Sequence, residues 1–167
     1  MGRLLVVVTA VFASLFFAAP AMAGTTTDFK ATFAEPLGGP VSSPFTCPTG
    51  DICGSGEVVG LGHVSESIVF GGGCGGTCDL RTITFADGST LVLEETEGDL
   101  ACPGNSDCRP FNVNSYGNPF SIPLTDTVEG ALSTGTFAGA TGTLTGQVSV
   151  AGAIAIITLS GTITLEC

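Results

Sequence analysis

The sequence predicts an all-β protein that folds as a single small antiparallel β-barrel of about eight strands. After residue 24, no window keeps the 3.6-residue apolar period of a helix, and the 25 glycines interrupt nearly every candidate helix. Several short segments instead alternate apolar and polar residues, and turn-forming residues separate most of them. Such strands form a sandwich or a barrel, and closure into a barrel removes the exposed edges.

The clearest alternation lies in residues 28–33, where Phe29, Ala31 and Phe33 share one face. Proline-rich residues 35–56 and 98–120 are expected to be loops. The other expected strands are residues 57–61, 64–70, 81–86, 89–94, 122–128, 143–150, 153–159 and 162–166.

The clearest hairpin has Asp87-Gly88 at its turn, between residues 81–86 and 89–94. An Asp-Gly pair supplies the positive φ angles that a tight two-residue turn requires. This hairpin is a further indication of antiparallel pairing.

Residues 1–23 have the pattern of a secretory signal peptide. Arg3 precedes an uncharged apolar run over residues 4–19, Pro20 ends the run, and Ala21-Met22-Ala23 places small residues at a cleavage site. The alternative is an uncleaved anchor, but the run is short for a span of about 20 residues. We therefore expect a secreted protein with its barrel domain at residues 24–167 and no membrane span after cleavage.

The charge balance excludes several classes of partner and reaction. The chain carries 15 acidic and 4 basic residues and one histidine, and only 11% of its residues are charged. With so little Lys and Arg to neutralise phosphate, nucleic acid is not an expected partner. The sequence also predicts no cofactor, no metal ion and no catalytic residue.

Six of the seven cysteines fall into three close couples, as expected for disulfides in an exported chain. The predicted bridges join Cys47 to Cys53, Cys74 to Cys78, and Cys102 to Cys108. Cys167 is left over; it is either free, paired between chains, or a competitor for one local partner. A four-cysteine zinc site that includes Cys74 and Cys78 is the alternative.

A glycine-rich stretch over residues 134–146 carries a family resemblance. Its Thr-Gly-Thr-Phe-Ala-Gly-Ala-Thr-Gly sequence, with Gly135, Phe137, Gly139 and Gly142, resembles a motif of bacterial exported relatives of the allene oxide cyclase and dirigent barrels. The match covers about the last 40 residues well. The resemblance implies an eight-stranded antiparallel barrel with a small apolar interior, in which Phe137 points inward.

Two further groups of residues are candidates for a functional site. His63 shares a strand face with Ser65 but no nucleophile motif surrounds it, so we expect a histidine at the surface or rim. The acidic run of residues 94–99, near Asp107, has carboxylates that suit calcium but lacks a regular calcium-binding loop. A solvated acidic edge is the expected role of this run.

The sequence thus favours an exported, non-catalytic barrel that holds a small apolar ligand, or none. One alternative is an isomerase or cyclase that acts on an apolar substrate inside the barrel. Another is an envelope or surface protein that binds partners through its loops. A carboxylate buried in an apolar cavity would favour the enzyme. A barrel filled by side chains would favour the interaction protein, and an empty apolar cavity would favour the ligand-binding protein.

Overall fold

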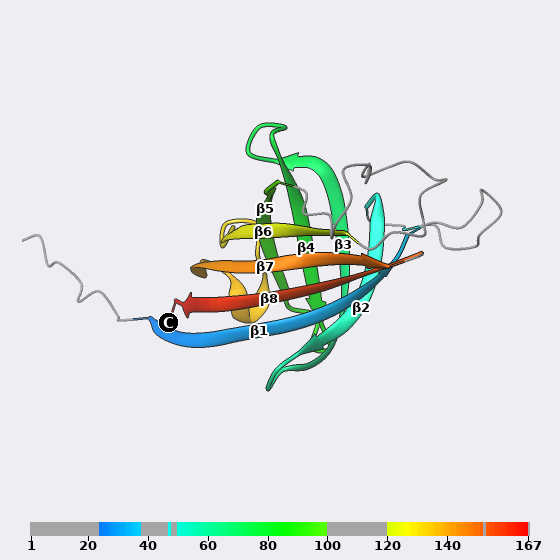
Figure 1. The fold of residues 1–167 in the computed structure, drawn as a ribbon. Helices are drawn as coiled ribbons and strands as arrows, with labels where there is room; N and C mark the ends of the chain where they lie inside the picture. The colour runs from blue at the N-terminus through cyan, green and yellow to red at the C-terminus, as the bar shows by residue number, and fades with distance from the viewer. Residues whose placement is uncertain (1–23, 38–46, 48–49, 100–119, 152, 167) are drawn as a thin grey trace, which may run out of the picture.

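A computed structural model of the protein describes residues 24–37, 47, 50–99, 120–151 and 153–166. Eight strands and one 3₁₀ helix make up the fold (Figure 1). The strands are β1 (Thr25–Pro36), β2 (Ile52–Val58), β3 (Gly62–Gly73), β4 (Cys78–Phe85), β5 (Thr90–Glu97), β6 (Phe120–Val128), β7 (Thr141–Ala151) and β8 (Ile154–Leu165); the helix is η1 (Gly135–Phe137).

The eight strands form a closed antiparallel barrel in which each strand pairs with its neighbours in sequence. β1 and β8 close it, with Thr25 opposite Leu165 at one end and Pro36 opposite Ile154 at the other. These first and last strands lie side by side in Figure 1. The structure confirms the predicted fold class, and the described part contains no helix long and apolar enough to cross a membrane.

Large apolar side chains fill the middle of the barrel. Leu93, Leu144 and Ile157 are fully buried, and every strand contributes at least one residue to the same core. The fit is close: a Cβ atom added at inward-facing Gly146 would lie 2.6 Å from Cδ2 of Leu159. Small residues on one strand therefore make room for large ones on the next.

Phe137 of η1 closes one end of the barrel. Its side chain is buried and stacks on Phe85 of β4, with ring centroids 4.6 Å apart. Gly135 and Gly139 flank it with φ angles of 61° and 73°, a backbone conformation that glycine adopts without strain. The motif that carries the family resemblance thus forms this end of the barrel.

Several predicted element boundaries are wrong. The two strands expected at residues 153–159 and 162–166 form one strand, β8 (Ile154–Leu165), because Gly161 continues the ladder opposite Leu144. Residues 59–61, expected to lie in a strand, form the turn between β2 and β3. The expected loops are shorter, since Glu35 and Pro36 lie in β1 and residues 52–56 in β2.

The β4–β5 hairpin also differs from the prediction. Its loop has three residues, Ala86-Asp87-Gly88, and the Gly88 amide donates to the Phe85 carbonyl at 3.0 Å. Gly88 has a positive φ of 85° and Asp87 does not. The pattern is that of a turn followed by a glycine bulge, which is the common three-residue hairpin.

Candidate functional site at the acidic end of the barrel

The end of the barrel opposite η1 buries a group of charged side chains on its inner face. Each comes from a different strand, and each is at most 3% exposed. The residues, referred to below as the charged cluster, are Glu35 (β1), Glu66 (β3), Arg81 (β4), Glu95 (β5) and Asp126 (β6). Four carboxyl groups thus surround one guanidinium inside a protein whose core is otherwise largely apolar.

Arg81 lies at the centre of the charged cluster. Its Nε and Nη2 donate to the two carboxylate oxygens of Glu95 at 2.7 and 3.1 Å. Its Nη1 donates to Glu35 at 2.8 Å and also to Glu66. The side chain passes over Phe33, with Cζ 5.8 Å from the ring centroid. Three carboxylates and an aromatic face therefore fix the guanidinium in place.

Gly54 of β2 provides the space for two of these acids. It lies opposite Glu66 in the β2–β3 ladder, and a Cβ atom at this position would lie 2.6 Å from Oε1 of Glu66. The same Cβ atom would lie 2.9 Å from Cγ of Glu35. Any larger residue at position 54 would therefore compete with the carboxyl groups that contact Arg81.

Asp126 is fully buried, and no N–H or hydroxyl group of the described residues donates a hydrogen bond to its carboxyl oxygens; the same holds for Oε1 of Glu66. The carboxyl group of Asp126 interacts instead with that of Glu95. Asp126 lies directly opposite Glu95 in the β5–β6 ladder, so their side chains share the inner face. Buried oxygens without such a donor are unusual in folded proteins, and they are the groups that a ligand, an ion or a bound proton satisfies.

The electrostatics favour bound protons on two of the acids. Burial, followed by the negative charge of Glu95, raises the pKa of Asp126 to about 8. Burial also raises the pKa of Glu66 to about 8, against the opposing charge of Arg81. The pKa of Glu35 is raised, mainly by burial. At neutral pH the charged cluster therefore holds protons on carboxyl groups that are ionised in water.

Two more acids extend the inner face outward at the same end. Asp79 lies opposite Glu95 in the β4–β5 ladder, and Glu97 follows two residues after Glu95. One carboxylate oxygen from each of these three residues lies within 4.8 Å of the others. Partial desolvation raises the pKa of Glu97, which lies at the exposed end of β5, and the charge of Asp79 adds to that effect.

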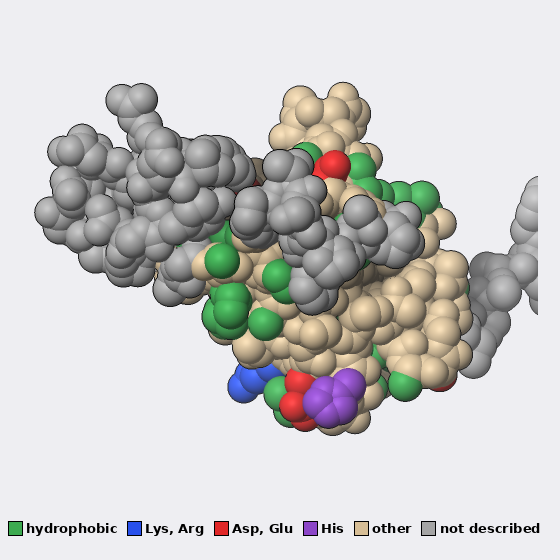
Figure 2. All heavy atoms as spheres, turned by 90° about the vertical axis from the view of Figure 1, so that its right-hand side faces the viewer, with side chains coloured by type: hydrophobic (Ala, Val, Ile, Leu, Met, Phe, Trp, Pro, Cys, Tyr) green, Lys and Arg blue, Asp and Glu red, His purple; other side chains and the backbone are tan. Residues whose placement is uncertain are grey.

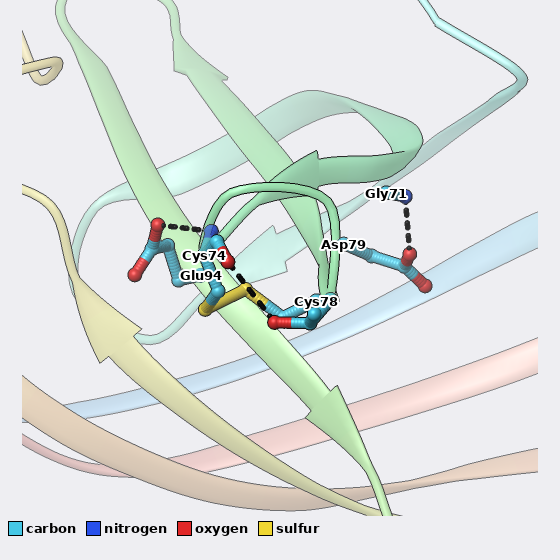
Figure 3. The surroundings of a disulfide bond; sticks show 6 residues. Gly71, Cys74, Cys78, Asp79 and Glu94 are labelled. Atoms are coloured by element: carbon cyan, nitrogen blue, oxygen red, sulfur yellow. Dashed lines mark hydrogen bonds between the residues drawn. A yellow bond between two sulfur atoms is a disulfide. The ribbon is translucent and has the colours of Figure 1, made fainter.

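The Cys74–Cys78 disulfide holds the hairpin that carries Asp79. Figure 3 shows the bridge with Glu94 on one side and Asp79 on the other. Glu94 accepts a hydrogen bond from the Cys74 amide at 2.7 Å, and Asp79 accepts one from the Gly71 amide at 2.8 Å. The hairpin thus fixes one oxygen of Asp79 and leaves the carboxylate on the inner side of β4.

Apolar side chains line the other half of this end. Ile122, Val148 and Val150 face inward from β6 and β7, and they retain 8–9% exposure where the residues of the barrel middle retain almost none. Ala155 of β8 lies opposite Glu35 of β1, where the apolar half meets the acidic half. The end of the barrel is therefore amphipathic, with acids on one wall and aliphatic side chains on the other.

The structure places the sequence-predicted residues as follows. The bridges Cys47–Cys53 and Cys74–Cys78 are present, so these cysteines are not free for zinc. The predicted bridge Cys102–Cys108, together with Asp107 and Cys167, lies outside the described residues. His63 is exposed on β3, and Figure 2 shows it at the surface beside acidic side chains.

The prediction for the acidic run was wrong at one residue. Glu97 and Asp99 are exposed and Glu94 lies on the outer side of β5, but Glu95 is buried against Arg81. Adjacent strand residues point to opposite faces, so a run of acids in a strand cannot be solvated throughout.

Sequence reasoning missed the other members of the charged cluster, although a signal for them exists. Each one lies an even number of positions from apolar core residues of its own strand and therefore points to the same face. Glu35 lies two residues after Phe33, and Asp126 lies two residues from both Leu124 and Val128. Arg81 likewise precedes Ile83 and Phe85 at steps of two. A charged residue on the apolar face of an alternating strand predicts a buried charge, and five such residues predict a cluster.

Comparisons with known proteins add no relative. No protein-family model matches the chain, and no curated protein or solved structure gives a significant match. The resemblance to the allene oxide cyclase and dirigent barrels therefore stays a prediction from the motif.

Proposed function

We propose that the chain is an exported, non-catalytic β-barrel protein that binds a small, mainly apolar molecule at its acidic end. The ligand carries a hydrogen-bond donor for the oxygens of Asp126 and Glu66 that accept no hydrogen bond from the N–H and hydroxyl groups of the described residues. Its apolar body lies against the aliphatic wall formed by Ile122, Val148 and Val150.

One observation carries this proposal: Asp126 is fully buried, and neither of its oxygens accepts a hydrogen bond from an N–H or hydroxyl group of the described residues. Burial of an unbonded polar group costs about 1–3 kcal/mol, and a ligand donor recovers that energy. The filled middle of the barrel supports the acidic end, rather than the central core, as the place of binding.

Export is supported by the signal-peptide pattern and by two disulfides, which persist in oxidising compartments. Intact mass of the protein recovered outside the expressing cell tests it. We expect a mature chain that begins at Gly24. A cell-associated chain that retains residues 4–19 would contradict export.

Ligand binding is tested with diphenylamine, an apolar molecule with one N–H donor, and with diphenylmethane, which has the same shape and no donor. Calorimetric titration in EDTA should show that diphenylamine binds about ten-fold more tightly, which corresponds to one buried hydrogen bond. Asp126→Leu should remove this preference. Asp28→Asn, which removes one acid at the opposite end of β1, should preserve it.

Two results would reject the proposal. One is the absence of saturable binding of either compound to the folded protein. The other is an equal preference for diphenylamine in the wild-type protein and in Asp126→Leu.

An isomerase or cyclase is the second candidate function, and the proton on Glu66 favours it. A carboxyl group with a pKa of about 8 beside a guanidinium is a suitable general acid at neutral pH. Incubation with an unsaturated fatty-acid epoxide, followed by chromatography for products of unchanged mass, tests this candidate. Turnover that Glu66→Gln abolishes would replace the binding proposal by the enzyme.

A further inference from the structure

We propose that the free edge of β1, over residues 26–30, is a docking site for an extended, basic peptide segment of another protein, which adds to the barrel as a further strand. This inference goes beyond the proposed small-molecule function. It does not depend on that function, because the edge lies in the N-terminal part of β1 and Glu35 lies near the other end of the strand.

β1 is longer than the pairing on one of its two sides. On the β8 side every residue from Thr25 to Pro36 has a partner. On the β2 side the pairing covers only residues 31–34, because the chain turns back towards β3 after Val58. In Figure 1 the N-terminal part of β1 runs on past this turn, with β8 beside it. Residues 26–30 therefore form a free edge of the sheet.

The backbone direction shows which groups this edge presents. The Lys30 carbonyl accepts from the Val59 amide at 2.9 Å, so the backbone of Lys30 points to the β2 side. Alternate residues of an antiparallel strand point to the same side, which assigns Thr26 and Asp28 to that side as well. No backbone group of the described residues bonds to the amides of Thr26, Asp28 and Lys30, or to the carbonyls of Thr26 and Asp28. The Asp28 carbonyl has a 3.5 Å contact with the Thr27 hydroxyl. Three amides and two carbonyls are thus available to another chain.

The inner face of β1 is uncovered along the same edge. Thr25 and Thr27 lie at steps of two before Phe29, so their side chains point to the inner face. Phe29 is buried, but Thr25 and Thr27 are exposed. The barrel therefore leaves space for side chains beside β1 over this stretch.

Two exposed apolar side chains lie where the edge ends. Val59 and Leu61, in the turn between β2 and β3, are 70% and 54% exposed. The bond between the Val59 amide and the Lys30 carbonyl places this turn directly beside the edge. Apolar side chains of a docked strand can pack against these two residues and remove them from water.

The backbone of an extended peptide is the partner that fits the edge. Its amides and carbonyls recur at every second residue on one side, as the free groups of β1 do. The charges of Asp28 and Lys30 on the edge cancel, so the net charge of the whole chain, −11, favours a basic segment. A second copy of the chain is disfavoured by the same net charge. Two copies paired about the centre of the edge would also place Asp28 opposite Asp28 of the second copy, and opposed like charges destabilise a strand pair.

The proposal can be tested with a synthetic peptide of about eight residues, in which valine alternates with threonine and an arginine stands at each end. Fluorescence anisotropy of a labelled peptide, acetylated and amidated at its ends, measures its binding to the purified protein. The control peptide has the same side chains and an N-methyl group on every backbone amide, so that it cannot donate to the edge. It should bind at least about ten-fold more weakly.

A proline variant tests the edge itself. Thr26→Pro removes one free amide, and a strand accepts proline where the N–H faces solvent. Thr26→Ala is the matched control, because it loses the same hydroxyl contact with Thr164, at 2.8 Å, and keeps the amide. Thr26→Pro should bind the peptide about five-fold more weakly than Thr26→Ala.

A second pair of variants tests the apolar turn. Leu61→Ser should weaken binding about three-fold, because it removes apolar surface beside the edge. Leu132→Ser is the control. Leu132 is 55% exposed, as Leu61 nearly is, but it follows β6, which is not adjacent to β1 or β2. This control should bind as the wild-type protein does.

Amide hydrogen exchange followed by NMR locates the bound peptide. In the free protein the amides of Thr26 and Asp28 should exchange fast, and those of Thr27 and Phe29, which point to β8, should exchange slowly. Saturating peptide should slow the exchange of Thr26 and Asp28.

The inference is overturned if the peptide shows no saturable binding up to about 1 mM, or if the N-methylated peptide binds equally well. It is also overturned if bound peptide leaves the exchange of Thr26 and Asp28 unchanged, because the peptide then binds elsewhere. Slow exchange of these two amides in the free protein, together with a dimer in sedimentation equilibrium, would replace the peptide by a second copy of the chain.

Discussion

Arg81 and Glu95 form a paired, bidentate hydrogen-bonded contact inside the barrel. The Nε–Oε2 and Nη2–Oε1 distances are 2.7 and 3.1 Å, and both side chains are buried. The planar guanidinium matches the carboxylate, which a lysine cannot do. Although burial opposes it, the charges of Glu95, Glu66 and Glu35 raise the pKa of Arg81, so the arginine stays charged.

Replacement of Arg81 should therefore be strongly destabilising. Arg81→Met keeps much of the aliphatic volume but leaves Glu35, Glu66 and Glu95 buried without their counter-charge. We expect the free energy of unfolding to fall by about 3–5 kcal/mol. Guanidinium unfolding followed by far-ultraviolet circular dichroism measures it, since the chain contains no tryptophan.

The matched control for that change is Lys30→Met on the exposed face of β1, which should alter stability by less than about 0.5 kcal/mol. Equal losses in the two variants would show that Arg81 is not the charge that balances the buried acids.

The stability of the barrel should fall as pH rises through the neutral range. The pKa of Glu66 is about 8 in the folded protein and near 4.5 in the unfolded chain, so between these values the folded state binds more protons. The free energy of unfolding then decreases from about pH 5 to about pH 8 and levels off above it. The raised pKa values of Glu35 and Asp126 act in the same direction.

Glu66→Gln should reduce this slope by at least about 1 kcal/mol over the range, because glutamine resembles the protonated acid and does not titrate. Urea unfolding at several pH values measures the slope. Glu57→Gln, the same change on an exposed residue of β2, serves as the control. An unchanged slope in Glu66→Gln would show that Glu66 is ionised throughout.

The sequence was a good guide to the barrel and a poor guide to its acidic end, for a physical reason. Alternation such as Phe29, Ala31 and Phe33 identifies an inner face within one strand, and closure follows from many such strands. The charged cluster depends on register between strands, for example Glu95 opposite Asp126, which are 31 positions apart. The pattern within one strand does not fix the register between strands. Charged residues that lie on the apolar face of their strand do indicate, however, that a partner must lie near them in the core.

Gly54 should be intolerant of even a small side chain. The Cβ atom of Gly54→Ala would approach both Oε1 of Glu66 and the Ala34 carbonyl oxygen, the latter at 2.9 Å, and the backbone atom cannot move aside easily. We expect a loss of about 1–3 kcal/mol, the usual effect of overpacking. Denaturant unfolding compares this variant with Ser55→Ala, the exposed neighbour, and equal stability of the two would show that the acids can rearrange.

Phe137 provides the last prediction, at the opposite end of the barrel. The side chain is 5% exposed and stacks on Phe85, so Phe137→Ala removes a large buried aromatic ring and one aromatic pair. We expect a loss of about 3–5 kcal/mol in the free energy of unfolding. Phe70→Ala is the control, because Phe70 is 46% exposed on β3 and should contribute less than about 1 kcal/mol. If Phe137→Ala lost no more than this control, η1 would not close the barrel, and the glycine-rich motif would have to be explained by a surface role.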